Sequence, residues 1–248
     1  MDKNQEIYKE LINACYEDYA VCFADILGTK ELLIQSKTPY DAGFPEAILN
    51  ALANQANSIE KIKVVQISDC MYIITKIENI DEMIRFLGCL ILQLFNSSEQ
   101  RINYTGSNPI NNCDMPIFML RGGITRGKAV FLNEQKNIIG PALCRAYEIE
   151  CQEAIKPRIV LDGNIIEIFR NREDIFSIDE DGKYYFDFLK YWTSRKEKIN
   201  LDWMIPILEN KINKCIEEEK KKENEKNVII SKKDKFEWMI KYIRDRVN

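Results

Sequence analysis

Two short apolar segments each carry a single aspartate, and this feature restricts the possible fold more than any other. Asp25 lies in the apolar run 21–27, which ends just before Gly28. Asp69 lies in the apolar run 64–74. Both runs have the composition of strands. A lone charge in a buried strand is costly to desolvate unless something neutralises it. Either aspartate alone fits a turn cap, but together they predict adjacent strand ends that hold a divalent cation such as Mg²⁺.

The composition is that of a globular protein with a large core. The chain has 248 residues, of which 46% are hydrophobic and 30% charged, and its net charge is -4. It shows no basic stripe for nucleic acid. Its longest apolar stretch, 86–95, is too short to span a bilayer, and its N-terminus lacks signal-peptide character. We expect a soluble cytoplasmic protein that binds neither nucleic acid nor membrane.

The chain has no histidine, and this excludes several kinds of catalytic and metal site. Zinc sites with histidine and Ser-His or Cys-His catalysis are impossible without it. The eight cysteines form no C-x-x-C pair, so we expect reduced core residues; they are Cys15, Cys22, Cys70, Cys89, Cys113, Cys144, Cys151 and Cys215. Any catalysis must therefore use carboxylates, metal ions and Lys or Arg side chains.

The pattern of apolar residues and turn signals predicts an α+β domain over 1–198 and a helical appendage over 199–248. Hairpins are expected around Asp69 and around Gly127, and residues 99–115 are expected to form a polar loop. The predicted strands are 20–26, 62–68, 70–77, 116–126, 128–132, 158–162 and 184–189. The predicted helices are 3–18, one from Lys30, 46–60, 80–98, one from Pro141 to about Ile155, 164–170 and, in the appendage, 232–246 with others before it.

Four motifs, in this order, resemble the catalytic domain of class III nucleotidyl cyclases. They are Asp25-Ile26-Leu27-Gly28, Ser68-Asp69 on a hairpin, Leu120-Arg121-Gly122-Gly123-Ile124 followed by Gly127, and Ile139-Gly140 at a helix start. The resemblance covers roughly residues 20–190 and implies a ferredoxin-like sheet with flanking helices. Further details resemble the pyrimidine cyclases of bacterial antiphage (Pycsar) systems: Asp25 to Lys30, Ile139-Gly140-Pro141-Ala142-Leu143 and Lys235-Phe236-Glu237-Trp238.

The resemblance implies a site for two metal ions and a triphosphate. Asp25, Asp69 and the Ile26 carbonyl would hold two Mg²⁺ or Mn²⁺ ions. The backbone amides of Leu27, Gly28, Thr29 and Lys30 would bind phosphate at a helix N-terminus. The Lys30 side chain either adds a charge there or is a solvated surface lysine.

The same resemblance points to a pyrimidine base. Asn137 lies at the base-reading position, although it also fits a turn residue, and Val65 replaces the lysine that reads purines. The family's transition-state Asn and Arg fall at Cys144 and Glu148. Arg121 or Arg145 would then stabilise the developing phosphate charge; Arg126 better fits a surface arginine.

The expected activity is the cyclisation of UTP or CTP to cyclic UMP or cyclic CMP, as an antiphage second messenger. The family implies a homodimer with composite active sites, and the messenger implies a separate effector that senses the cyclic nucleotide. Two alternatives remain open. One is an adenylate or guanylate cyclase, and the other is a non-catalytic cyclase-like domain that binds a nucleotide or a protein.

Overall fold

A mixed eight-stranded sheet forms the centre of the molecule. The computed structural model describes residues 16–29, 33–34, 47, 49–50, 52–54, 61–104, 117–132, 137–221 and 226–247. The strands are β1 (Glu17–Leu27), β2 (Ile62–Ile67), β3 (Cys70–Lys76), β4 (Met119–Leu132), β5 (Asn137–Ile139), β6 (Ile159–Leu161), β7 (Phe176–Ile178) and β8 (Tyr184–Phe186). Their order is β2-β3-β1-β4-β6-β8-β7, with β5 paired to β4. Only the β4–β6 pairing among these is parallel, and the predicted α+β class is confirmed.

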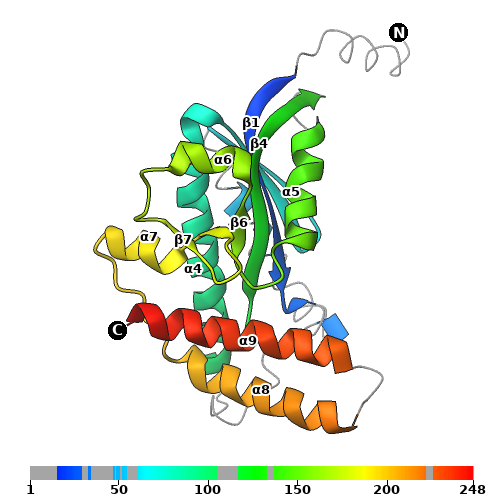
Figure 1. The fold of residues 1–248 in the computed structure, drawn as a ribbon, viewed down its shortest axis with the longest axis vertical. Helices are drawn as coiled ribbons and strands as arrows, with labels where there is room; N and C mark the ends of the chain where they lie inside the picture. The colour runs from blue at the N-terminus through cyan, green and yellow to red at the C-terminus, as the bar shows by residue number, and fades with distance from the viewer. Residues whose placement is uncertain are drawn as a thin grey trace.

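Helices cover both faces of this sheet (Figure 1). Successive side chains of β1 point to opposite faces of the sheet, so alternate residues contact different helices. Ala20, Cys22 and Ala24 share a core with α4, whereas Val21 and Phe23 pack with α5. The helices are α4 (Ile80–Tyr104), α5 (Pro141–Gln152), α6 (Gly163–Ile166), α7 (Phe188–Ser194), α8 (Met204–Lys221) and α9 (Lys226–Val247), with short 3₁₀ turns η1 (Ile77–Asn79) and η3 (Glu167–Phe169). Because Asp25 follows Phe23 by two residues, it lies on the α5 face.

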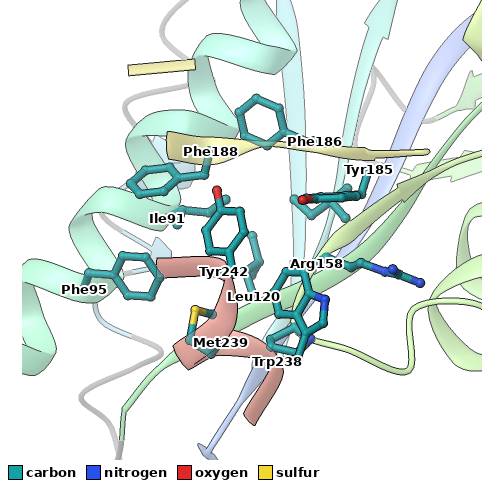
Figure 2. A pocket seen from close by; sticks show the side chains of 12 residues that line it. Ile91, Phe95, Leu120, Arg158, Tyr185, Phe186, Phe188, Trp238, Met239 and Tyr242 are labelled. Carbon is teal, nitrogen blue, oxygen red and sulfur yellow. The ribbon is translucent and has the colours of Figure 1, made fainter. Parts of the chain in front are cut away.

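Helices α8 and α9 pack against each other and against the sheet (Figure 1). Figure 2 shows side chains of α9 beside Arg158, the residue before β6, around a cavity of about 30 Å³. The carboxylate of Asp187, which is fully buried, accepts hydrogen bonds from Tyr242 Oη (2.9 Å) and Arg246 Nε (2.7 Å) of α9. Trp238 Nε1 donates to Asp179 at 2.7 Å. Buried polar contacts therefore fix α9 to the sheet.

The predicted hairpin at Gly127 is wrong, because β4 runs without interruption from Met119 to Leu132. Gly127 lies opposite Tyr19 of β1, and a Cβ at Gly127 would be 3.2 Å from that of Ala142 in α5. This glycine therefore permits the close approach of a helix and does not mark a turn.

Other differences concern the ends of elements. The predicted loop from 99 is helical as far as Tyr104, and residues 17–18, predicted as helix, begin β1. Residues 3–15 lie outside the described part, as does most of 30–60, where the described residues 47, 49–50 and 52–54 are helical. Strands β5 and β7 and helix α7 were not predicted.

The expectation that the cysteines lie in the core holds only in part. Cys22 and Cys215 are buried, Cys70 is half-buried, and three others are exposed: Cys89, Cys144 and Cys151. All six are free thiols, while Cys15 and Cys113 lie outside the described residues. In the described part of the chain, no helix has the length and apolarity needed to cross a membrane.

Candidate functional site

The two aspartates predicted from the sequence lie together at one end of the sheet. Asp25 is near the end of β1, where it pairs in register with Cys70 of β3 and Arg121 of β4. Asp69 is in the turn between β2 and β3. The Ile26 amide donates a hydrogen bond to the Asp69 carbonyl oxygen at 3.2 Å, which ties this turn to the end of β1.

Thr29 completes the connection between the two segments. Its hydroxyl group lies 2.5 Å from Asp69 Oδ2 and 3.2 Å from the Ile26 carbonyl oxygen, and the residue is buried. The chain reaches Thr29 through Gly28, whose φ of 105° is in the region that favours glycine. Leu27, Gly28 and Thr29 therefore lie beside the aspartates, while Lys30 is outside the described residues.

Arg121 and Glu150 add a second pair of charges. Arg121 Nε donates to Asp25 Oδ2 at 3.2 Å, and its Nη2 lies 2.6 Å from Glu150 Oε1. Glu150 comes from α5 and is only 2% exposed. Burial raises the pKa of Asp25, Arg121 opposes this, and Glu150 and Asp69 raise it further. Three carboxylates and one guanidinium leave this site with a net charge of −2.

This donor set fits a hard divalent cation. Asp25, Asp69 and the Ile26 carbonyl supply oxygen ligands, and Mg²⁺ needs only one or two carboxylates besides water and substrate phosphate. Burial and the nearby aspartates raise the pKa of the Cys70 thiol to about 11, so it stays protonated at neutral pH. Within the described ranges there is no cluster of three or more His, Cys, Asp and Glu side chains that could hold a metal. Any cation here would complete its shell with water and substrate.

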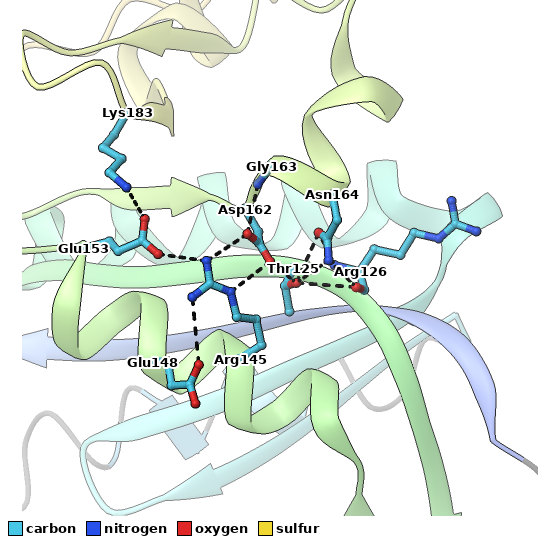
Figure 3. Close-up of polar contacts among 9 residues, drawn as sticks. All are labelled: Thr125, Arg126, Arg145, Glu148, Glu153, Asp162, Gly163, Asn164 and Lys183. Carbon is cyan, nitrogen blue, oxygen red and sulfur yellow. Dashed lines mark hydrogen bonds and ion pairs between the residues drawn. The ribbon is translucent and has the colours of Figure 1, made fainter.

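Arg145, another predicted site residue, belongs to a separate network (Figure 3). Its guanidinium binds both oxygens of Asp162, at 3.1 and 2.9 Å, and Glu153 at 2.9 Å, while Glu148 lies 3.9 Å away. Glu153 also binds Lys183. Three carboxylates therefore surround Arg145, which leaves it little capacity to bind an anion.

Asn137 lies far from Asp25 within one chain. It begins β5 opposite Leu132 of β4, eleven residues along that strand from Arg121, the register partner of Asp25. At about 3.3 Å per residue this is roughly 35 Å. One chain therefore does not bring Asn137 to the aspartates.

The remaining positions singled out from the sequence are also accounted for. Cys144 and Glu148, which the resemblance assigned to transition-state positions, are exposed on α5. Arg126 is at the surface, 3.5 Å from Asp18. Val65 packs on the α5 face of β2. Sequence analysis missed Glu150, although its place four residues after Ala146 and eight after Ala142 puts it on the buried face of that helix.

Comparison with known proteins identifies the fold. No family model matches this sequence, and no curated protein matches it. Two solved structures of bacterial light-regulated adenylyl cyclases are similar. One has a TM-score of 0.52 and 13% identity over 80% of this chain and 57% of its own. The other has a TM-score of 0.50 and 14% identity over 70% of this chain and 52% of its own.

This chain thus spans a little over half the length of those two proteins. The adenylyl cyclase CyaB from P. aeruginosa aligns with 70% of this chain and 95% of its own, at 17% identity and a TM-score of 0.47. Identities this low establish the fold alone. The chain has a central sheet and flanking helices that match class III cyclase domains.

Proposed function

We propose that this protein is a metal-dependent nucleotidyl cyclase that converts a pyrimidine nucleoside triphosphate into a 3′,5′-cyclic monophosphate and pyrophosphate. The observation that carries the proposal is the proximity of Asp25 and Asp69. The Ile26–Asp69 backbone hydrogen bond holds their two segments together, in a site of net charge −2. A scaffold has no need for this excess of negative charge, whereas a cation-binding site does.

Each residue of the site has a role in this proposal. Asp25, Asp69 and the Ile26 carbonyl would hold two Mg²⁺ or Mn²⁺ ions. Bound there, the ions would supply activation of the ribose 3′-hydroxyl and neutralisation of the triphosphate and pyrophosphate charge. The turn 27–29 binds phosphate through backbone amides, and Gly28 allows the close approach that this requires.

Of the two arginines considered for the phosphates, we assign that role to Arg121. It lies beside Asp25, whereas Arg145 is surrounded by Asp162, Glu153 and Glu148. An arginine next to the metal ligands can stabilise charge that develops on the α-phosphate and the leaving group. The role of Arg145 is then to hold α5 on the end of β6.

The proposed active unit is a homodimer, with the base-reading Asn137 supplied by the partner. The separation of Asn137 from Asp25 within one chain supports this arrangement. The exposed side chains Ile67, Ile139 and Tyr147, on β2, β5 and α5, supply apolar surface for such an interface.

The preference for UTP or CTP rests on two side chains. Asn137 can donate and accept hydrogen bonds at a pyrimidine edge, and Val65 offers no charge to a purine. The proposed biological role follows from the Pycsar resemblance. The product would be an antiphage second messenger in the cytoplasm, sensed by a separate effector.

A second candidate is a non-catalytic cyclase-like domain that binds a nucleotide or a protein. The exposed acid Glu148, in place of the family's transition-state arginine, favours it. Incubation with UTP, CTP, ATP and GTP and either Mg²⁺ or Mn²⁺, with mass spectrometry of the products, separates the candidates. A cyclic pyrimidine product supports the proposal, a cyclic purine product supports a purine cyclase, and intact triphosphates with measurable binding support the non-catalytic domain.

A further inference from the structure

Arg121 bridges two carboxylates, and its two contacts are unequal. Arg121 Nη2 forms an ion pair with Glu150 Oε1 at 2.6 Å, although this oxygen accepts no hydrogen bond from the described residues, and Arg121 Nε donates a hydrogen bond to Asp25 Oδ2 at 3.2 Å. The Glu150 side chain is 3% exposed, whereas that of Asp25 is 22% exposed. Asp25 and Arg121 are register partners on adjacent strands, while Glu150 reaches them from α5.

The two contacts therefore differ in what their loss costs. A carboxylate as buried as Glu150 is strongly destabilised without a cationic partner. Asp25 is closer to water, and an ion pair that is partly exposed contributes little. Asp25 can also take its neutralising charge from another cation. If one of the two contacts opens, the contact with Asp25 opens first.

We propose that Arg121 is an internal counter-ion for Asp25 that a divalent cation displaces, and that Glu150 is the positioning residue that retains Arg121 at the site. This inference rests on the proposed role of Asp25 as a metal ligand. When the cation displaces Arg121, Arg121 Nε loses its hydrogen bond to Asp25. A phosphate oxygen bound at the neighbouring turn can then accept this hydrogen bond in place of Asp25. Cation binding and phosphate binding are then coupled, and each strengthens the other.

The decisive variant conserves the net charge. In the double variant Arg121→Gln/Glu150→Gln, one positive and one negative charge are removed and two amides replace the ion pair. The net charge of the site is then unchanged, while the competitor for Asp25 is gone. We expect Mn²⁺, titrated into nucleotide-free protein and followed by electron paramagnetic resonance, to bind about three- to tenfold more tightly than to wild type.

The single variant Glu150→Gln tests the positioning role. Without its buried anchor, Arg121 pairs with Asp25 alone, so Mn²⁺ should bind about three- to tenfold more weakly than to wild type. Arg172→Gln is the matched control, because it removes an arginine charge from a surface pair with Asp81 (2.7 Å). Its Mn²⁺ affinity should stay within about twofold of wild type. Thermal unfolding establishes that each variant is folded.

The outcomes separate this inference from the proposed function. If wild type binds Mn²⁺ and the double variant binds it equally or more weakly, the displacement of Arg121 by a cation is overturned. The cyclase proposal then still stands. A wild type that binds no Mn²⁺ overturns both. A merely structural role for the pair predicts lower stability without tighter Mn²⁺ binding. In an active enzyme, the double variant should also show a higher KM for the triphosphate.

Discussion

The amide nitrogen of Ile26 donates a hydrogen bond to the carbonyl oxygen of Asp69 across 3.2 Å, which joins the end of β1 to the turn between β2 and β3. This bond connects residues more than forty positions apart in sequence. It brings Asp25 and Asp69 to one end of the sheet, and the proposed chemistry depends on that proximity. The Thr29 hydroxyl reinforces it by its contact with Asp69.

Thr29→Val should reduce turnover at least about tenfold and should also lower the free energy of unfolding. The substitution keeps the shape but removes a hydrogen bond to a charged group, for which about 1.5–3 kcal/mol is typical. Thr75→Val is the matched control, because the Thr75 hydroxyl, also buried, donates to the Lys61 carbonyl at 2.6 Å away from the site. Steady-state kinetics should show a defect in Thr29→Val alone, and equal defects in both variants would argue against the role of Thr29.

Two inactive variants should complement each other if the site is composite. Asp25→Ala disables the metal ligands of one protomer, and Asn137→Ala disables the base-reading position that β5 contributes. A mixed dimer contains one intact site, so random mixing should restore about a quarter of wild-type activity. Full activity from a strictly monomeric protein, measured by light scattering alongside the assay, would contradict this arrangement.

The Arg145 network should stabilise the fold above about pH 4 and lose this contribution in acid. Burial alone would raise the pKa of Asp162, but hydrogen bonds from Arg145 and Thr125 outweigh it and lower that pKa, and Lys183 and Arg145 likewise lower the pKa of Glu153. A carboxyl whose pKa is lower when folded stabilises the protein above its unfolded pKa, and this is lost as pH falls through the folded pKa.

Arg145→Gln should therefore lower the free energy of unfolding at pH 7 by about 1 kcal/mol, since solvent screens a side chain that is 39% exposed. Near pH 3 the difference from wild type should shrink. Urea denaturation at both pH values tests this. An equal difference at both would mean that the ion pairs do not cause the effect.

Arg246→Leu should destabilise the protein by about 3 kcal/mol, because it leaves the fully buried Asp187 without its cationic partner. Arg244→Gln, two residues earlier on the same helix, removes a charge from an exposed ion pair with Glu209 and should cost less than about 1 kcal/mol. Urea denaturation compares the two. Similar stability of both variants would mean that α9 is not fixed through Asp187.

Sequence patterns predicted the central strands and the partnership of the two aspartates, because alternation and buried charge are local signals. They misjudged Gly127, since a glycine that admits a helix and a glycine that forms a turn look alike in sequence. They missed Glu150 as a partner of Arg121, because this ion pair joins a strand to a later helix. They could not place Arg145 beside Asp162, a contact that exists only once α5 packs on the end of β6.

The most direct test of the central claim is product analysis after incubation of wild type, Asp25→Asn and Asp69→Asn with UTP, CTP, ATP and GTP in Mn²⁺ or Mg²⁺. The proposal predicts a cyclic pyrimidine monophosphate and pyrophosphate from wild type and none from either variant, with all three proteins folded. Cyclic AMP or cyclic GMP alone would contradict the base assignment. No cyclic product from any triphosphate, or equal turnover by the aspartate variants, would contradict the proposed function itself.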